Sequence, residues 1–225
     1  MMLRMSEADH ARVSAAVAEA ERSSDGEIVT IVAPRSDAYH DVGLHYAVLG
    51  MVLVPVLWAL VPQSTVDWAL GRFLGWNETA ARGLLMTLLF VKLAAMFLII
   101  RYALAYMPLR LALTPGGTKT RRVRRRAIEL FRVAAENKTE GRTGILLYLS
   151  LAEHRAEIVA DAAIHSKVEP DVWGEAMAVL IENVKAGRAG EGMALAVEKI
   201  GAVLAEHLPP HHDNPNELSD RLIEI

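Results

Sequence analysis

The stretch Val42–Val61, VGLHYAVLGMVLVPVLWALV, decides how this chain is organised. It is apolar apart from His45 near its start, and its length suits a helix that crosses the roughly 30 Å of hydrocarbon in a bilayer. A second stretch, Gly83–Ile100 (GLLMTLLFVKLAAMFLII), is interrupted only by Thr87 and Lys92. Because neither stretch has a long polar face, a larger protein than this one would be needed to bury both. We therefore predict two transmembrane helices, about 42–61 and 83–100.

The composition agrees with a folded domain attached to a membrane anchor. The chain has 225 residues, of which 52% are hydrophobic and 23% charged, with a net charge of −3. Its mean hydropathy of +0.23 is high for a soluble protein with this share of charged residues. The absence of cysteine excludes disulfides, thiolate metal sites and a cysteine nucleophile. The near-neutral net charge gives no reason to expect a polyanion as partner.

The charges around the two apolar stretches predict their orientation. The connector 62–82 contains only Arg72 and Arg82 as cations. The flank after the second stretch carries many more, with no acid between them: Arg101, Arg110, Lys119, Arg121, Arg122, Arg124, Arg125 and Arg126. The positive-inside rule then predicts a hairpin in the inner membrane with both termini in the cytoplasm. A cleavable signal peptide is not expected, because a charged, helix-like segment precedes the first apolar run.

The segment before the hairpin predicts one helix and one strand. Ser6 with Asp9 three residues later is a capping pattern, and apolar residues follow at helical spacing. Residues 27–33 (EIVTIVA) form a compact, β-branched run that predicts a strand. One helix and one strand do not make a stable domain. Their partners must therefore come from beyond the hairpin.

The segment after the hairpin supplies those partners. It predicts a helix over 119–137, a turn at Gly141–Gly144, strands over 145–151 and 155–160, and helices over about 170–186 and 191–208. We therefore predict an α/β domain split into 6–40 and 115–208. It is interrupted by a transmembrane hairpin at 42–107 and followed by a polar C-terminal tail at 209–225.

This order of elements, together with several short sequence segments, resembles the TPM-domain family of membrane-associated proteins, sometimes labelled a phosphatase family. The resemblance covers about 6–39 and 118–208. The matching segments are Gly26–Val32 (GEIVTIV), Gly141–Leu149 (GRTGILLYL), Arg155–Ile158 (RAEI) and Lys185–Arg188 followed by Glu191–Met193. It implies the family's small sheet flanked by helices. It transfers no catalytic residue, because Arg142-Thr143 and Ala160–Ala163 stand where the family often has an aspartate and a glycine-rich stretch.

Two groups of His and Asp are candidates for chemistry. Asp37, His40, Asp41 and His45 have spacings that could line one helical face before the first span and share a metal, or simply form a polar helix start. Asp161 and His165 lie four residues apart at a strand-to-helix junction, where such a pair can perform acid/base chemistry. No nucleophile or phosphate-binding loop accompanies them, so a structural pair is the alternative.

One lysine and one run of basic residues are best explained by contact with a membrane. Lys92 lies near the middle of the second span, so it either contacts a partner helix or second copy, or reaches for the outer surface. The run from Lys119 to Arg126 has six cations in eight residues: Lys119, Arg121, Arg122, Arg124, Arg125 and Arg126. Without interleaved aromatic residues it favours anionic lipid headgroups over nucleic acid.

These observations lead to two functional hypotheses. The first is a two-pass inner-membrane protein that presents a cytoplasmic TPM-like domain as an interaction, assembly or maintenance module, with a membrane protein or a second copy as partner and no cofactor. The alternative is a phosphatase-like hydrolase at the membrane surface, in which Asp161 and His165 would work with a divalent metal.

Overall fold

The computed structural model describes residues 5–74, 82–136, 139, 143–210 and 216–225. The chain forms two compact units, one from residues 1–38 and 116–225 and the other from residues 39–115. The second unit is thus an insertion in the first. The turn predicted at 141–144 lies partly outside the described residues.

Unit 1 is built on a mixed sheet of four strands in the order β3-β2-β1-β4. Strands β1 (Glu27–Ala33) and β2 (Gly144–Ser150) are parallel, with Ile28 opposite Ile145, and β2 continues into the antiparallel β3 (Arg155–Ala160). Every residue of β1 and β2 is buried, which explains their nearly continuous apolar sequences. The predicted strands 27–33 and 155–160 are confirmed to the residue, and the strand predicted at 145–151 is shifted by one.

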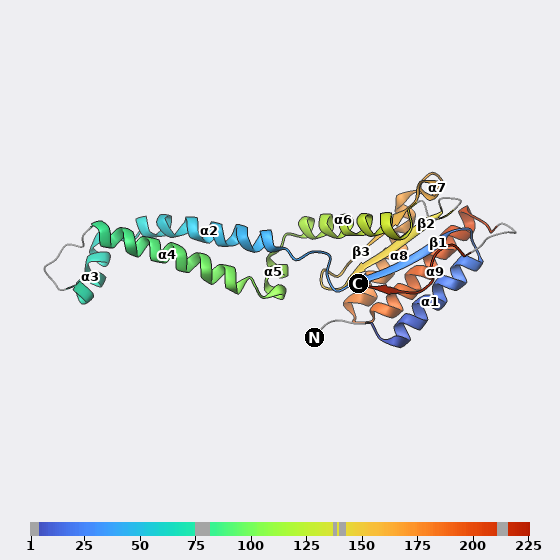
Figure 1. The fold of residues 1–225 in the computed structure, drawn as a ribbon, viewed down its shortest axis with the longest axis horizontal. Helices are drawn as coiled ribbons and strands as arrows, with labels where there is room; N and C mark the ends of the chain where they lie inside the picture. Colours follow the sequence, from blue (N-terminus) through green and yellow to red (C-terminus); the bar gives the residue numbers. More distant parts are fainter. Residues whose placement is uncertain (1–4, 75–81, 137–138, 140–142, 211–215) are drawn as a thin grey trace. The chain divides into compact units, whose positions relative to one another are not determined.

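Helices cover both faces of this sheet (Figure 1). On one face lie α1 (Glu7–Arg22), α8 (Gly174–Lys185) and α9 (Ala189–His207), whose apolar residues pack with Ile28, Val32 and Leu147. On the other lies α6 (Gly116–Ala134), which packs Val123 and Phe131 against the sheet. Two short helices, α7 (Ala162–His165) and the 3₁₀ helix η1 (Pro170–Trp173), precede α8. The mixed α/β class with flanking helices is confirmed.

Local sequence explains the start of α1 and its close packing on α9. Ser6 accepts a hydrogen bond from the Asp9 backbone N–H at 3.1 Å, and the Asp9 carboxylate accepts one from the Ser6 N–H at 3.2 Å, which is the predicted capping box. Farther along, a Cβ on Gly201 would lie 2.6 Å from the Ala20 Cβ. Only a glycine at position 201 allows α1 and α9 to approach this closely.

The C-terminus corrects the prediction of a polar tail over 209–225. Strand β4 (Ile223–Glu224) pairs with β1 in parallel, and the Ile225 N–H donates to the Val32 carbonyl at 3.1 Å. Leu222 is buried in the core beneath it. The chain returns because β1 otherwise has an open edge, whose unpaired backbone groups favour another strand. Residues 211–215 of the predicted tail lie outside the described part.

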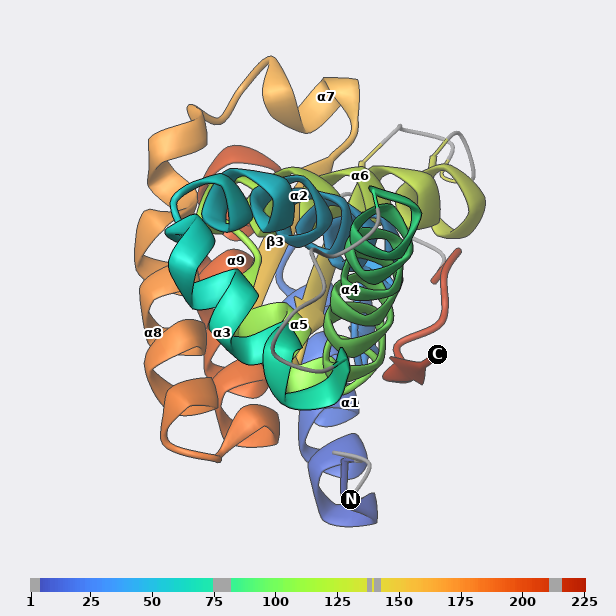
Figure 2. The ribbon, with the colours of Figure 1, turned by 90° about the vertical axis from the view of Figure 1, so that its left-hand side faces the viewer.

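Unit 2 contains α2 (His40–Ala59), α3 (Gln63–Leu74), α4 (Arg82–Ala103) and α5 (Met107–Leu113). Helices α2 and α4 are long and apolar enough to cross a membrane, with mean hydropathies of 1.9 and 2.4. They pack antiparallel, with Gly50 against Ile100 and Gly43 against Leu104. Figure 2 shows α3 beside the hairpin, in the connector for which no helix was predicted.

Candidate functional site

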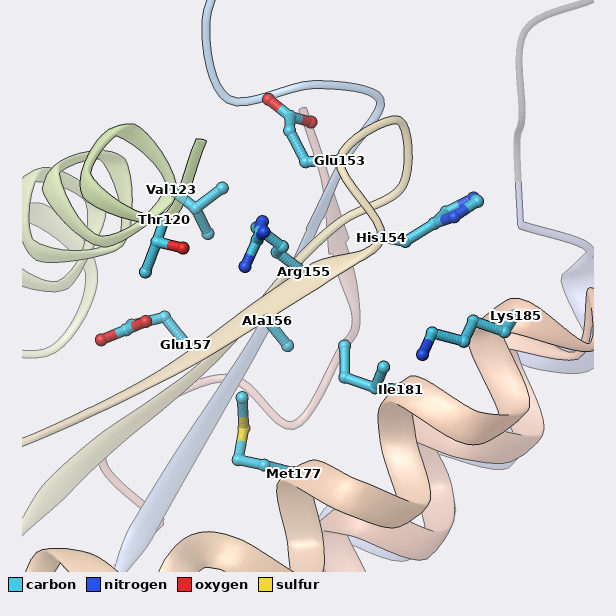
Figure 3. Close-up of a pocket in the computed structure, with 10 residues that line it drawn as sticks. All are labelled: Thr120, Val123, Glu153, His154, Arg155, Ala156, Glu157, Met177, Ile181 and Lys185. Atoms are coloured by element: carbon cyan, nitrogen blue, oxygen red, sulfur yellow. The ribbon is translucent and has the colours of Figure 1, made fainter. Parts of the chain in front are cut away.

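A cavity of about 460 Å³ opens on unit 1 beside the first residues of β3 (Figure 3). Its wall is formed by the first turns of α6, the β2–β3 turn, β3 and one side of α8. The residues that line it are Thr120, Val123, Glu153, His154, Arg155, Ala156, Glu157, Met177, Ile181 and Lys185. We call this the β3 pocket. It combines apolar side chains with charges of both signs.

Arg155 is the cation at the centre of the β3 pocket. A tight turn precedes it, in which His154 takes a positive φ of 47°, and this turn places Arg155 at the first position of β3. Its Nε is buried and has no hydrogen-bond partner within the described residues. Its Nη2 would lie 3.5 Å from a Cβ on Gly116, at the N-terminus of α6. A guanidinium at the wall of a pocket is suited to bind a carboxylate or phosphate group.

Other side chains give the β3 pocket a second cation and an apolar floor. Figure 3 shows the Lys185 amine directed toward Ile181 and the pocket, and Met177 below β3. Thr120 contributes a hydroxyl from α6. A ligand that matches this lining carries a negative group next to an apolar body.

The two acids of the β3 pocket already have partners. Glu153 accepts a hydrogen bond from the Ser36 N–H at 2.9 Å and another from the Ser150 hydroxyl, and it thereby holds the β2–β3 turn. Burial raises the pKa of Glu157, and Arg124, 3.6 Å away, lowers it in part. Glu153 is engaged with Ser36 and Ser150, and Glu157 with Arg124, so Arg155 and Lys185 are the cations of the described lining that can attract an anion.

The Asp161–His165 pair is not arranged as an acid and its base. Asp161 is buried and caps α7, where its Oδ1 accepts a hydrogen bond from the Ala162 N–H at 2.9 Å. Only the backbone of His165 contacts Asp161, through an N–H···O bond of 3.1 Å, and the His165 side chain is exposed. The geometry is therefore that of a helix cap.

Of the four residues considered for a metal site or a polar helix start, His40, Asp41 and His45 lie in α2 and Asp37 precedes it. Helix α2 begins at His40, so Asp37 precedes it and pairs instead with Arg122 and Arg125 of α6, at 3.1 and 3.0 Å. His45 bonds through Nδ1 to the Asp41 carbonyl at 2.6 Å. Across the part of the chain that the structure describes, no three His, Asp or Glu side chains are grouped to hold a metal ion.

His40 has a different partner, which the sequence did not reveal. Its Nδ1 accepts a hydrogen bond of 3.2 Å from the Arg110 guanidinium, whose Nε donates to the Leu104 carbonyl at 2.6 Å. Arg110 is only 4% exposed. In the sequence Arg110 is one cation of a basic flank, whereas the structure shows that it joins α5 to α2 and α4.

The basic run of α6 is largely engaged within unit 1. Arg122 and Arg125 pair with Asp37, Arg124 pairs with Glu157, and Arg126 pairs with Glu129 at 3.4 Å. Lys119 and Arg121 have no ion pair among the described residues. A membrane surface would therefore meet fewer uncompensated charges than the six counted in the sequence.

Lys92 contacts its own hairpin. Its Nζ lies 3.3 Å from the centroid of the Trp58 ring, a cation–π contact between α4 and the end of α2. This intramolecular contact was not among the explanations considered for Lys92 from the sequence.

The fold of this chain is similar to that of a protein whose structure has been solved. No family model and no curated protein matches the chain. The NMR structure of BA42 protein from the psychrophilic bacterium Bizionia argentinensis is similar, with a TM-score of 0.55 and 14% sequence identity. The alignment covers 98% of this chain and 94% of that one. At this identity the similarity concerns the fold alone.

Proposed function

We propose that this chain is a two-pass inner-membrane protein whose TPM-like α/β unit faces the cytoplasm and binds acidic segments of membrane-protein partners. The observation that carries the proposal is the apolar exterior of the hairpin. Large side chains point outward along both helices, with Leu57 57%, Phe90 69% and Ile99 63% exposed. Hydrocarbon is the environment in which such a surface is stable.

The β3 pocket supports a binding role close to the anchor. The chain leaves unit 1 after residue 38 and re-enters it at Gly116, which lies next to Arg155. A partner held in the β3 pocket is therefore tethered, through the chain, to the same hairpin. A guanidinium, a lysine and an apolar floor are suited to a peptide that carries a carboxylate beside an apolar side chain.

Alkaline carbonate extraction and cysteine labelling test the membrane part of the proposal. Because the natural chain has no cysteine, single substitutions at exposed positions report on one place each. We expect the protein to stay in the carbonate-washed membrane. A membrane-impermeant maleimide added to intact spheroplasts should label Ser64→Cys on α3 but not Ala202→Cys on α9. Extraction by carbonate, or labelling of both positions, would contradict the proposal.

Site-specific crosslinking tests the binding part. A photoreactive amino acid at Met177, in the full chain in native membranes, should give discrete adducts with membrane proteins. Arg155→Gln should reduce these adducts at least fivefold, whereas Arg132→Gln, an exposed and paired cation of the same unit, should not. Adducts that are unaffected by Arg155→Gln would show that the β3 pocket is not the binding site.

A further inference from the structure

A second cavity, of about 520 Å³, lies within unit 2 at the end of the hairpin. It is lined by Trp58 and Val61 at the end of α2, Val66 and Leu70 of α3, and Leu88 and Lys92 of α4. We call it the hairpin cavity. Apart from Thr65 and Lys92 its lining is apolar. Helix α3 forms one wall because it places Val66, Ala69 and Leu70 on one side, at helical spacing.

Lys92, the charged residue among the described lining of the hairpin cavity, has an incomplete set of partners. The Trp58 ring lies 3.3 Å from Lys92 Nζ and stabilises the positive charge. An aromatic face is not a hydrogen-bond acceptor of full strength, and an ammonium has three donors. No oxygen atom of the described residues accepts a hydrogen bond from Lys92. The cavity therefore offers a cation with free donors beside an apolar surface.

The packing of α2 on α4 places Lys92 near one end of the first span. Gly43 contacts Leu104 and Trp58 contacts Lys92, so these pairs mark two levels along the hairpin. The fifteen residue-to-residue steps from Gly43 to Trp58 correspond to about 22 Å of helix. With Gly43 at the inner boundary of a hydrocarbon layer about 30 Å thick, Lys92 lies past the centre and about 8 Å short of the outer headgroups, a distance that its long side chain shortens by reaching outward.

We propose that the hairpin cavity binds one anionic phospholipid of the outer leaflet, with its phosphate on Lys92 and an acyl chain against Val66, Leu70 and Leu88. Charge complementarity identifies this occupant, because the cavity holds one cation and no acid among its lining residues. A zwitterionic lipid carries its own ammonium, which competes for the same phosphate. The inference rests on the membrane insertion proposed above.

The test uses the full chain reconstituted in nanodiscs with equal amounts of phosphatidylglycerol and phosphatidylcholine. Native mass spectrometry after mild detergent release then counts the lipids that stay bound. We expect wild type to retain one phosphatidylglycerol with about tenfold preference. Lys92→Met, which keeps the length but removes the charge, should abolish the preference. Lys92→Arg should keep it, and Ala69→Trp, which fills the cavity, should displace the lipid.

Two further measurements separate this inference from membrane insertion itself. Lys199→Met, which removes a cation of α9 outside both the cavity and the basic run, should retain the bound lipid. Loss of the lipid from this variant would overturn the proposal in favour of general charge attraction. Flotation with vesicles is measured for every variant. If wild type floats with the vesicles but shows no preference for phosphatidylglycerol, the proposed lipid site is wrong, although membrane insertion holds. The same conclusion follows if Lys92→Met keeps that preference. If wild type does not float, the membrane anchor itself is wrong.

Discussion

The carboxyl group of Glu21, in the last turn of α1, accepts a hydrogen bond of 2.8 Å from the backbone N–H of Ile28 at the start of β1. This contact joins the first helix to the central sheet. Burial raises the pKa of Glu21 from 4.5 to about 8, and the nearby charges of Glu27 and Asp220 act in the same direction. The group is therefore protonated in the folded protein at neutral pH.

Glu21 makes the stability of unit 1 depend on pH. Because its folded pKa lies above the unfolded value, its contribution is complete below about pH 4.5 and is lost as the pH rises toward 8, at up to about 1.4 kcal/mol per pH unit. Burial also raises the pKa of Glu27, which adds a loss of the same sign. Glu21→Gln should flatten this decline in thermal melts between pH 5 and 8. Glu19→Gln, on an exposed residue of the same helix, should leave the pH dependence of the melting temperature as it is in wild type.

The C-terminal strand should contribute substantially to the stability of unit 1. Leu222 is 5% exposed and belongs to the main core, so Leu222→Ala should lower the free energy of unfolding by about 2–4 kcal/mol. Ile225 is 46% exposed, and Ile225→Ala should cost far less. Denaturant titration of the detergent-solubilised chain measures both. Equal effects would mean that residues 222–225 do not pack as described.

The basic run of α6 should act on lipid chiefly through Lys119 and Arg121. In liposomes, energy transfer from a dye on Ala202→Cys to labelled lipid should rise when anionic lipid is added. Lys119→Gln with Arg121→Gln should remove most of that rise, since each cation near the surface contributes about 1 kcal/mol.

The matched double variant is Arg122→Gln with Arg125→Gln. These two arginines are held by Asp37, so this variant should change the energy transfer less and the melting temperature more. The opposite ranking would show that all the cations of the run reach the lipid equally.

The variant Asp161→Ala distinguishes a helix-capping role of Asp161 from a catalytic one. Loss of an N-cap side chain costs about 0.5–2 kcal/mol, and we expect this variant to be less stable by that amount. We expect no metal-dependent turnover of generic phosphate esters by the full chain. Turnover in wild type that disappears in both Asp161→Ala and His165→Ala would instead support the hydrolase hypothesis.

Strands and helix starts were predictable because their signals are local. The β-branched run 27–33 and the run 155–160 are strands with the predicted bounds, and Ser6 with Asp9 forms the predicted cap. Residues 63–74 were missed as a helix because their polar residues resemble those of a loop. Strand β4 was missed because two residues have no periodicity, and only the open edge of β1 makes them a strand.

The candidate site was less predictable, because charges acquire their roles from distant partners. Asp37 was grouped with His40 by proximity in the sequence, whereas its partners Arg122 and Arg125 come from across the insertion. Arg155 is one arginine among many in the sequence, and only packing leaves its Nε buried without a partner. Lys92 was recognised as unusual, but its ring partner depends on how α2 and α4 are paired.

Hydrophobic patterning along the chain determined by itself that an α/β unit is interrupted by two long apolar helices, since periodicity and length are written in consecutive residues. The tertiary structure alone decided which charges are paired, which are left to bind a ligand, and where the last strand inserts. Those outcomes depend on distances between residues far apart in the chain, and a residue's neighbours in sequence carry little information about them.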